Sequence, residues 1–105
     1  MNNVRVKHYI LVKTGNESSF NEGNTFNCLI FQLDETVAPL YPDVNVESLF
    51  RCITNQGDIK AGDKLIIVNN NNSEFNNNDS FIVYKDFVKT KIMGNVIYSG
   101  IIIKE

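Results

Sequence analysis

Side chains able to carry out catalysis are few in this chain and far apart. His8 is the only histidine, and Cys28 and Cys52 each lie among apolar residues. Because residues 4–13 alternate as a strand does, His8 falls on the buried face, where a histidine with a hydrogen-bonded ring is more usual than a general base. A thiol–imidazole pair of Cys28 and His8 has no local signature. We therefore expect a core histidine, two buried free thiols and no enzymatic activity.

The sequence motifs for metals and cofactors also fail to match. Asp43 begins a segment that opens like a calcium-binding loop, but Ser48 stands where that loop needs Gly and Thr54 where it needs Glu. Two cysteines and one histidine lack the paired spacing of a zinc site. Neither glycine-rich phosphate motif occurs in the sequence. We expect no metal site and no cofactor.

Acidic residues dominate the first half of the chain, since there is no Lys or Arg between Thr14 and Phe50. We expect the loops of this region to present an acidic surface to a basic protein partner, with solvated loops of no binding function as the alternative. Phe75, the one large apolar residue in a long polar loop, is a candidate contact for such a partner; a neutral, mobile insertion is the alternative. The acidic candidates are Glu17, Glu22, Asp34, Glu35, Asp43 and Glu47.

The basic residues gather near the two ends of the sequence and suggest a second function. If the two groups lie side by side, their cations and aromatic ring would form a groove like those in which small barrels hold single-stranded nucleic acid. An ordinary exposed sheet face is the alternative, and the net charge of −2 disfavours binding to nucleic acid. The residues concerned are Arg5, Lys7, Tyr9 and Lys13 on the first predicted strand, and Lys85, Lys89 and Lys91 later in the chain.

The elements that would position these residues are mostly β-strands. Val4–Lys13 alternates between apolar and polar residues, and the apolar runs Thr25–Leu33 and Asn95–Lys104 are typical of strands. Thr14–Asn24 is rich in Gly, Asn and Ser and predicts a loop. The connection 34–45 contains two prolines, which disfavour regular structure.

Val46–Thr54 fits two different structures. Its apolar residues recur at helical spacing, with Asn45 as a candidate N-cap and Gly57 just beyond the end, and this pattern favours a short helix. Residues 50–54 (Phe-Arg-Cys-Ile-Thr) have the composition of a strand instead. We expect the helix and keep the strand as the alternative.

Residues 58–87 predict a β-hairpin with a long loop. Gly62 and Asp63 form a turn before Leu65–Val68, and the polar stretch Asn69–Asp79 separates that strand from Ser80–Phe87. The stretch DIKAGDKLII resembles the turn and strand of many small β-barrels, including barrel domains of translation factors and SH3-like modules. The resemblance covers about a tenth of the chain; it implies a small barrel and assigns no functional residue.

Two further features complete the predicted strands. Residues 88–93 either continue the strand Ser80–Phe87 or form a bend, and Gly100 inside the last strand indicates a bulge or a close backbone approach. We expect one β-rich domain over residues 1–105, a small antiparallel β-barrel or sandwich of five to six strands. The class is mainly β, or α+β if Val46–Thr54 forms its short helix.

The function predicted from these patterns is that of a non-enzymatic protein-binding or structural accessory module, whose partner is another protein or a second copy. A small β-barrel that binds nucleic acid is the alternative, and a small enzyme or ligand-binding barrel comes third. The abundance of Asn, Ile and Lys fits AT-rich coding, as in phages, viruses and some bacteria. The amino terminus has no apolar signal core and no run of residues could span a bilayer, so we expect a cytoplasmic protein, in the host cytoplasm if it is viral, without membrane contact.

Overall fold

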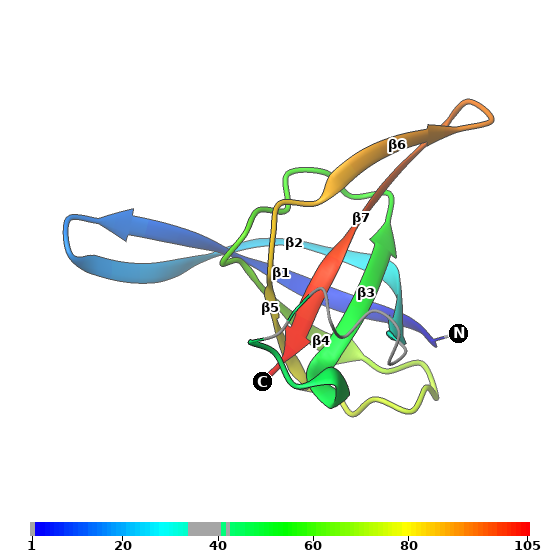
Figure 1. Cartoon of the computed structure of the whole chain (residues 1–105), viewed down its shortest axis with the longest axis horizontal. Coiled ribbons are helices and arrows are strands. Elements are labelled where there is room, and N and C mark those ends of the chain that lie inside the picture. Colours follow the sequence, from blue (N-terminus) through cyan, green and yellow to red (C-terminus); the bar gives the residue numbers. More distant parts are fainter. Residues whose placement is uncertain (1, 34–40, 42) are drawn as a thin grey trace.

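The computed structural model describes residues 2–33, 41 and 43–105 of the chain. These residues form seven strands, all in one sheet and paired antiparallel in the order β3-β2-β1-β4-β5-β7-β6 (Figure 1). Because β3 pairs with β7 as well as with β2, the sheet curls round and six of its strands form a closed circuit. The strands are β1 (Asn2–Thr14), β2 (Glu17–Gln32), β3 (Leu49–Thr54), β4 (Lys64–Asn69), β5 (Ser80–Val83), β6 (Val88–Ile92) and β7 (Asn95–Lys104).

The mainly β class with an antiparallel sheet is confirmed, but the strand count of five to six is too low. Val88–Ile92 neither continues β5 nor forms a bend, because it is a strand of its own, β6. It pairs with β7 through a tight turn in which Met93 and Gly94 have φ of 50° and 84°. Positive φ at both turn residues is the pattern of a type I′ hairpin, whose twist suits paired strands.

The core lies inside the curled sheet and follows the two-residue period of its strands. On β3 the residues Phe50, Cys52 and Thr54 are buried, whereas Arg51 and Ile53 between them are only half-buried. The aromatic centre of the core is a group of three rings, Phe50, Phe75 and Phe81, whose centroids lie 5.4–5.8 Å apart in edge-to-face geometry. A smaller apolar cluster outside the circuit comprises Leu33, Leu49 and Ile101, with Tyr41, Val44, Tyr84 and Ile103 packed against it.

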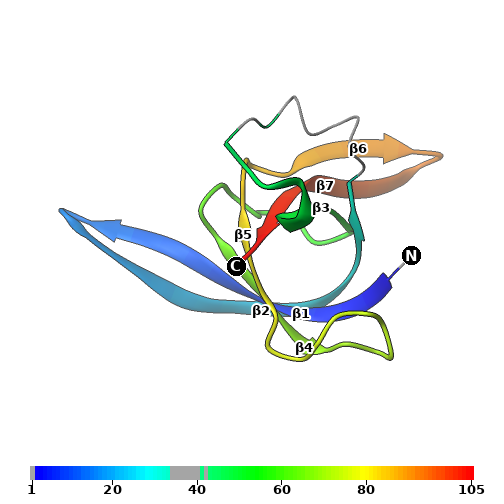
Figure 2. The same ribbon diagram turned by 60° about the horizontal axis from the view of Figure 1, so that its bottom comes forward.

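The prediction of a loop over Thr14–Asn24 is wrong, because almost all of it belongs to β1 and β2. A two-residue turn at Gly15 and Asn16 joins the two strands, and Gly15 has the positive φ of 63° that glycine adopts without strain. β4 pairs with β1 only as far as Tyr9, and β3 pairs with β2 only from Cys28 onward. The outer part of this hairpin is therefore a two-stranded ribbon, which we call the β1–β2 arm, projecting from the body (Figure 2).

The helix expected over Val46–Thr54 is also wrong, and the strand alternative is correct for most of the segment. Only Val46–Ser48 is helical, as a single 3-10 turn, and β3 follows at once. Asn45 does act as the N-cap, since its side chain accepts a hydrogen bond from the backbone N–H of Glu47. The apolar residues at helical spacing fill two environments instead: Leu49 packs in the smaller apolar cluster, and Phe50 packs in the core.

The asparagine-rich stretch between β4 and β5 is a folded loop that contributes Phe75 to the core, and neither expectation for it holds. Phe75 is 4% exposed and packs against Phe50 and Phe81, so it is not a neutral insertion and does not present its ring to a partner. Asparagine side chains hold the loop, as when Asn77 accepts from the backbone N–H of Asn70 at 2.8 Å. Asn71, Asn72 and Asn78 have positive φ, which asparagine tolerates better than most residues.

Candidate functional site

The one histidine is a structural residue of the core. His8 and Asp63 are 3% and 2% exposed, and Nε2 of His8 lies 2.7 Å from Oδ2 of Asp63. The Asp63 carboxylate also accepts hydrogen bonds from the backbone N–H groups of Leu11 and Lys60, each at 3.0 Å. This carboxylate thus joins β1 to the turn that precedes β4. The expectation of a core histidine with a hydrogen-bonded ring is confirmed, and sequence reasoning missed Asp63 as its partner.

The two cysteines are buried free thiols, as predicted. A hydrogen bond with the Cys28 thiol and burial together raise the pKa of Cys52 well above its usual value. A thiol that stays protonated is a poor nucleophile, because the thiolate is the reactive form. Cys52 is therefore unsuited to nucleophilic chemistry.

The acidic residues of the first half do not form one surface. Glu17 and Glu22 lie on the β1–β2 arm, where Glu22 is paired with Lys7 at 3.1 Å. Asp43 and Glu47 lie beside the 3-10 turn, away from the arm (Figure 1). Asp34 and Glu35 fall outside the described residues. The described acidic residues are thus divided between two places.

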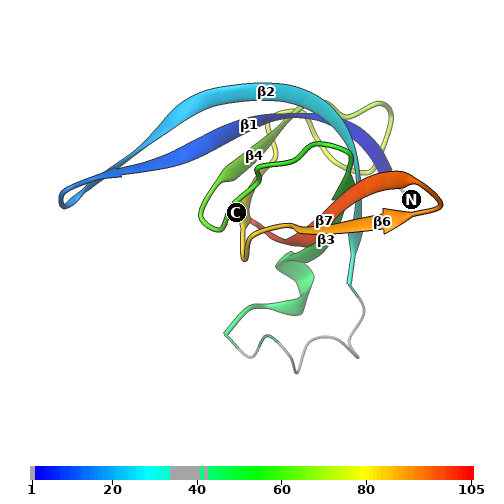
Figure 3. The same ribbon diagram turned by 90° about the horizontal axis from the view of Figure 1, so that it is seen from above.

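The basic residues are divided as well. Arg5, Lys7, Tyr9 and Lys13 lie on β1, whereas Lys89 and Lys91 lie on β6 and Lys85 just before it. In the ladder β4, β5 and β7 separate β1 from β6, and the two strands lie on opposite sides of the curled sheet (Figures 2 and 3). The single groove that would combine both groups is therefore not formed.

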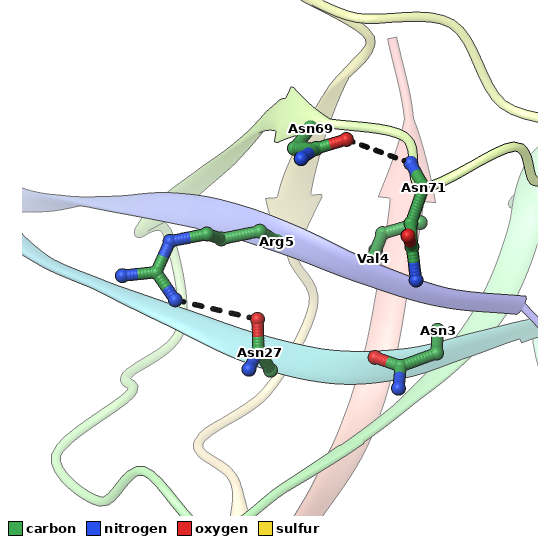
Figure 4. Close-up of a pocket in the computed structure, with 6 residues that line it drawn as sticks. All are labelled: Asn3, Val4, Arg5, Asn27, Asn69 and Asn71. Carbon is green, nitrogen blue, oxygen red and sulfur yellow. Dashed lines mark hydrogen bonds between the residues drawn. The ribbon is translucent and has the colours of Figure 1, made fainter.

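A small polar pocket opens on the outer face of β1 (Figure 4). Arg5 donates to Oδ1 of Asn27 at 3.3 Å, and Asn69 accepts from the backbone N–H of Asn71 at 2.9 Å. Asn3 and Val4 complete the lining, and the pocket has a volume of about 160 Å³. Sequence reasoning missed this pocket because it attributed the asparagines to genome composition alone. The amides and the guanidinium can form hydrogen bonds with a small polar ligand, but the Asn27 and Asn69 amides already have partners within the protein.

A larger cavity of about 360 Å³ lies where β7 leaves β3 and meets β6. It combines cations, hydroxyl groups and an apolar floor, and Arg51 is the one lining residue that comes from β3. Sequence reasoning did not single out Arg51, although its position between two core residues, Phe50 and Cys52, signals a side chain on the outer face of a strand. The lining residues are Tyr41, Arg51, Lys85, Asp86, Val88, Ser99, Gly100 and Ile101.

The β6–β7 hairpin extends this region into a surface rich in exposed apolar side chains. Val88 is 64% exposed and Met93 at the tip is 97% exposed, and Ile92 and Val96 are exposed as well. Every residue of β6 is exposed, and the strand has a single neighbour, β7, so its outer backbone edge has no paired strand among the described residues. The hairpin projects from the body on the side opposite the β1–β2 arm (Figures 1 and 3).

The fold and these surfaces define a small, all-antiparallel β protein with two projecting ribbons. Compared with protein-family models, with curated proteins and with solved structures, the chain has no significant match. Across residues 2–33, 41 and 43–105, no group of three or more His, Cys, Asp or Glu side chains is placed to hold a metal ion. None of the helical residues in the same ranges forms a helix long and apolar enough to cross a membrane.

Proposed function

We propose that this protein is a non-enzymatic binding module that takes up an extended segment of another protein along β6. The observation that carries the proposal is the β6–β7 hairpin, which combines a strand edge that no described strand pairs with and exposed Val88, Ile92 and Met93. An extended peptide that adds to such an edge gains main-chain hydrogen bonds from the strand and side-chain contacts from its faces. Exposed apolar residues gathered on one element are typical of interaction sites.

A second copy of the chain is a poor partner for this edge. If two β6 strands paired antiparallel about a two-fold axis centred on Thr90, Lys89 of each strand would face Lys91 of the other. Like charges directly opposite each other destabilise a strand pair, and lysines on an edge are a known protection against self-pairing. The same lysines favour an acidic segment. We therefore assign the edge to a different protein.

Catalysis has little support in the described residues. The buried His8–Asp63 pair lines neither of the two cavities described above. The acidic surface expected for a basic partner has less support than the hairpin, because Glu22 is already paired with Lys7 and the described acidic residues lie in two places.

The proposal is tested by selecting binders from a displayed library of random twelve-residue peptides. The double variant Ile92→Ser, Met93→Ser should reduce the affinity for selected peptides about tenfold, because it removes apolar contact area at the hairpin. Val68→Ser on β4 is the matched control, since Val68 is also an exposed apolar strand residue at 43%. Backbone amide chemical shifts should change along β6 on binding. A library that yields no binders, or binders that ignore the hairpin variant, would refute the proposal.

A further inference from the structure

The cavity beside the hairpin is continuous with the face of the hairpin that carries Val88. Val88 and Ser99 face each other across β6 and β7, and both line the cavity. On the far side of β7 the cavity reaches Arg51, whose partner in the strand ladder is Ile101. A segment bound along β6 therefore has a recess next to it that can receive one of its side chains.

The cations of this cavity have no acidic partner among the described side chains. Within residues 2–33, 41 and 43–105 Arg51 makes no ion pair, and the Lys85 ammonium lies 6.0 Å from the centre of the Tyr84 ring. Asp86, the one carboxylate in the lining, is bound by the backbone N–H of Ala61 at 2.8 Å. Counted over the described lining residues, two positive charges and one negative charge leave a net charge of about +1.

The tyrosine and glycine parts of the lining pack against neighbouring residues of the fold. The Tyr84 ring packs edge-to-face on Tyr41 at 5.3 Å, and the backbone N–H of Tyr84 donates to Ile101 of β7. Gly100 contributes only backbone to the lining, and a Cβ at this position would clash with the Phe87 ring. The close approach predicted at Gly100 is thus confirmed. These parts of the lining are therefore formed before a ligand arrives, which lowers the entropic cost of binding.

We infer that this cavity is a carboxylate-binding subsite that holds an Asp or Glu side chain of the segment bound along β6. A guanidinium presents two parallel donors that match a carboxylate, and Lys85 with the hydroxyls of Ser99 and Tyr41 can supply further hydrogen bonds. A singly charged carboxylate balances the net charge of the site. The charge of a dianionic phosphate would be larger than the net positive charge of the site, and Asp86 would repel it. The inference rests on the proposed function, because the carboxylate belongs to the segment bound along β6. It implies that this segment contains an acidic residue.

The first test is a double-mutant cycle with a selected peptide. Selected peptides should share an Asp or Glu at one position, and changing it to Asn or Gln should weaken binding about tenfold. Arg51→Met should weaken binding of the acidic peptide to the same degree and leave the affinity for the peptide with Asn or Gln unchanged. Lys85→Met, in the connection outside the strands, repeats the test without altering β3. Arg5→Met, on the opposite side of the sheet, is the control and should change neither affinity.

Two outcomes of this cycle separate the inference from the proposed function. If Arg51→Met and Lys85→Met affect acidic and amide peptides equally while the hairpin variant still weakens both, the subsite is wrong and binding along β6 stands. If no peptide depends on the hairpin, the proposed function fails.

A second test examines the subsite without any peptide. N-acetyl-glutamate N-methylamide should cause saturable chemical-shift changes at Arg51 Nε and at Ser99, with a dissociation constant on the order of millimolar. These changes should disappear in Arg51→Met. Inorganic phosphate at the same concentration should bind more weakly. Stronger binding of phosphate than of the carboxylate, or no change at Arg51 with either probe, would overturn the inference.

Discussion

At the scale of single residues, the buried Asp63 carboxylate connects two parts of the fold through three hydrogen bonds. Its carboxylate accepts from His8, Leu11 and Lys60, and it is 2% exposed. Gly62 before it packs against Leu11, because a Cβ at Gly62 would lie 2.7 Å from Cδ2 of that side chain. The Gly-Asp turn, which sequence reasoning treated only as a connection between strands, therefore fixes β1 to β4.

We predict that Asp63→Ala lowers the free energy of unfolding by roughly 3 kcal/mol, because it leaves the buried His8 ring and two part-buried backbone N–H groups without their partner. Asp63→Asn should cost less, since its amide oxygen can still accept from Leu11. Urea unfolding at pH 7 measures both changes, with Asp58→Asn as the exposed control. A loss for Asp63→Ala no larger than that of the control would show that these hydrogen bonds do not hold the strands together.

At the scale of elements, prediction from sequence succeeded where one face of a strand is buried. β1 was found because its side chains alternate between core and solvent, whereas the buried part of β2, β4 and β7 were found as apolar runs, and β7 has the predicted limits. The outer half of β2 was missed because a ribbon exposed on both faces needs no alternation. Its strand pairing rests on backbone hydrogen bonds and on the turn at Gly15.

Other errors at this scale have equally specific causes. The residues after Val46 satisfy a helical spacing by coincidence, because Leu49 and Phe50 serve two different apolar clusters on opposite faces of β3. Phe75 stood alone in a polar stretch, and a single apolar residue gives no period from which burial can be predicted. Of the candidate site, the lysines near β6 were identified in advance. The cavity was not, because it depends on Arg51 of β3 and Lys85 of the β5–β6 connection, which are distant in sequence, lining the same space.

The β1–β2 arm should be separable from the folded body. Residues 13–18 are exposed, whereas Leu11 contacts Gly62, and the Lys64 ammonium lies 5.1 Å from the centre of the Phe20 ring. Replacing residues 13–18 by Asn-Gly keeps those contacts and gives a two-residue hairpin between Val12 and Ser19, which already pair. We predict a change in unfolding free energy of less than about 1 kcal/mol, measured by urea unfolding. Loss of cooperative unfolding would show that the arm is part of the core structure.

At the scale of the whole molecule, the closed circuit of strands separates two groups of surface features. The polar pocket with Arg5 lies on the outer face of β1, and the hairpin with its cationic cavity lies on the other side, at β6 and β7 (Figures 2 and 3). A ligand that needs both groups of cations at once would have to wrap around the sheet. This arrangement favours a local partner on one side, as in the proposed function, over a long polyanion.

The salt dependence of binding to single-stranded DNA tests this arrangement. The two groups of cations predicted to bind nucleic acid have three members each (Arg5, Lys7 and Lys13; Lys85, Lys89 and Lys91). Neutralising about three phosphates gives a slope near −2 when the logarithm of the binding constant is plotted against that of the salt concentration. We predict a slope no steeper than this for a twenty-nucleotide strand, with weak binding at physiological salt because the net charge is −2. Two double variants should have independent effects on DNA affinity: Lys89→Glu with Lys91→Glu, and Arg5→Glu with Lys7→Glu. A slope near −4, or a loss of all binding with either pair, would mean that both groups contact one strand, and nucleic-acid binding would then replace peptide binding as the better function.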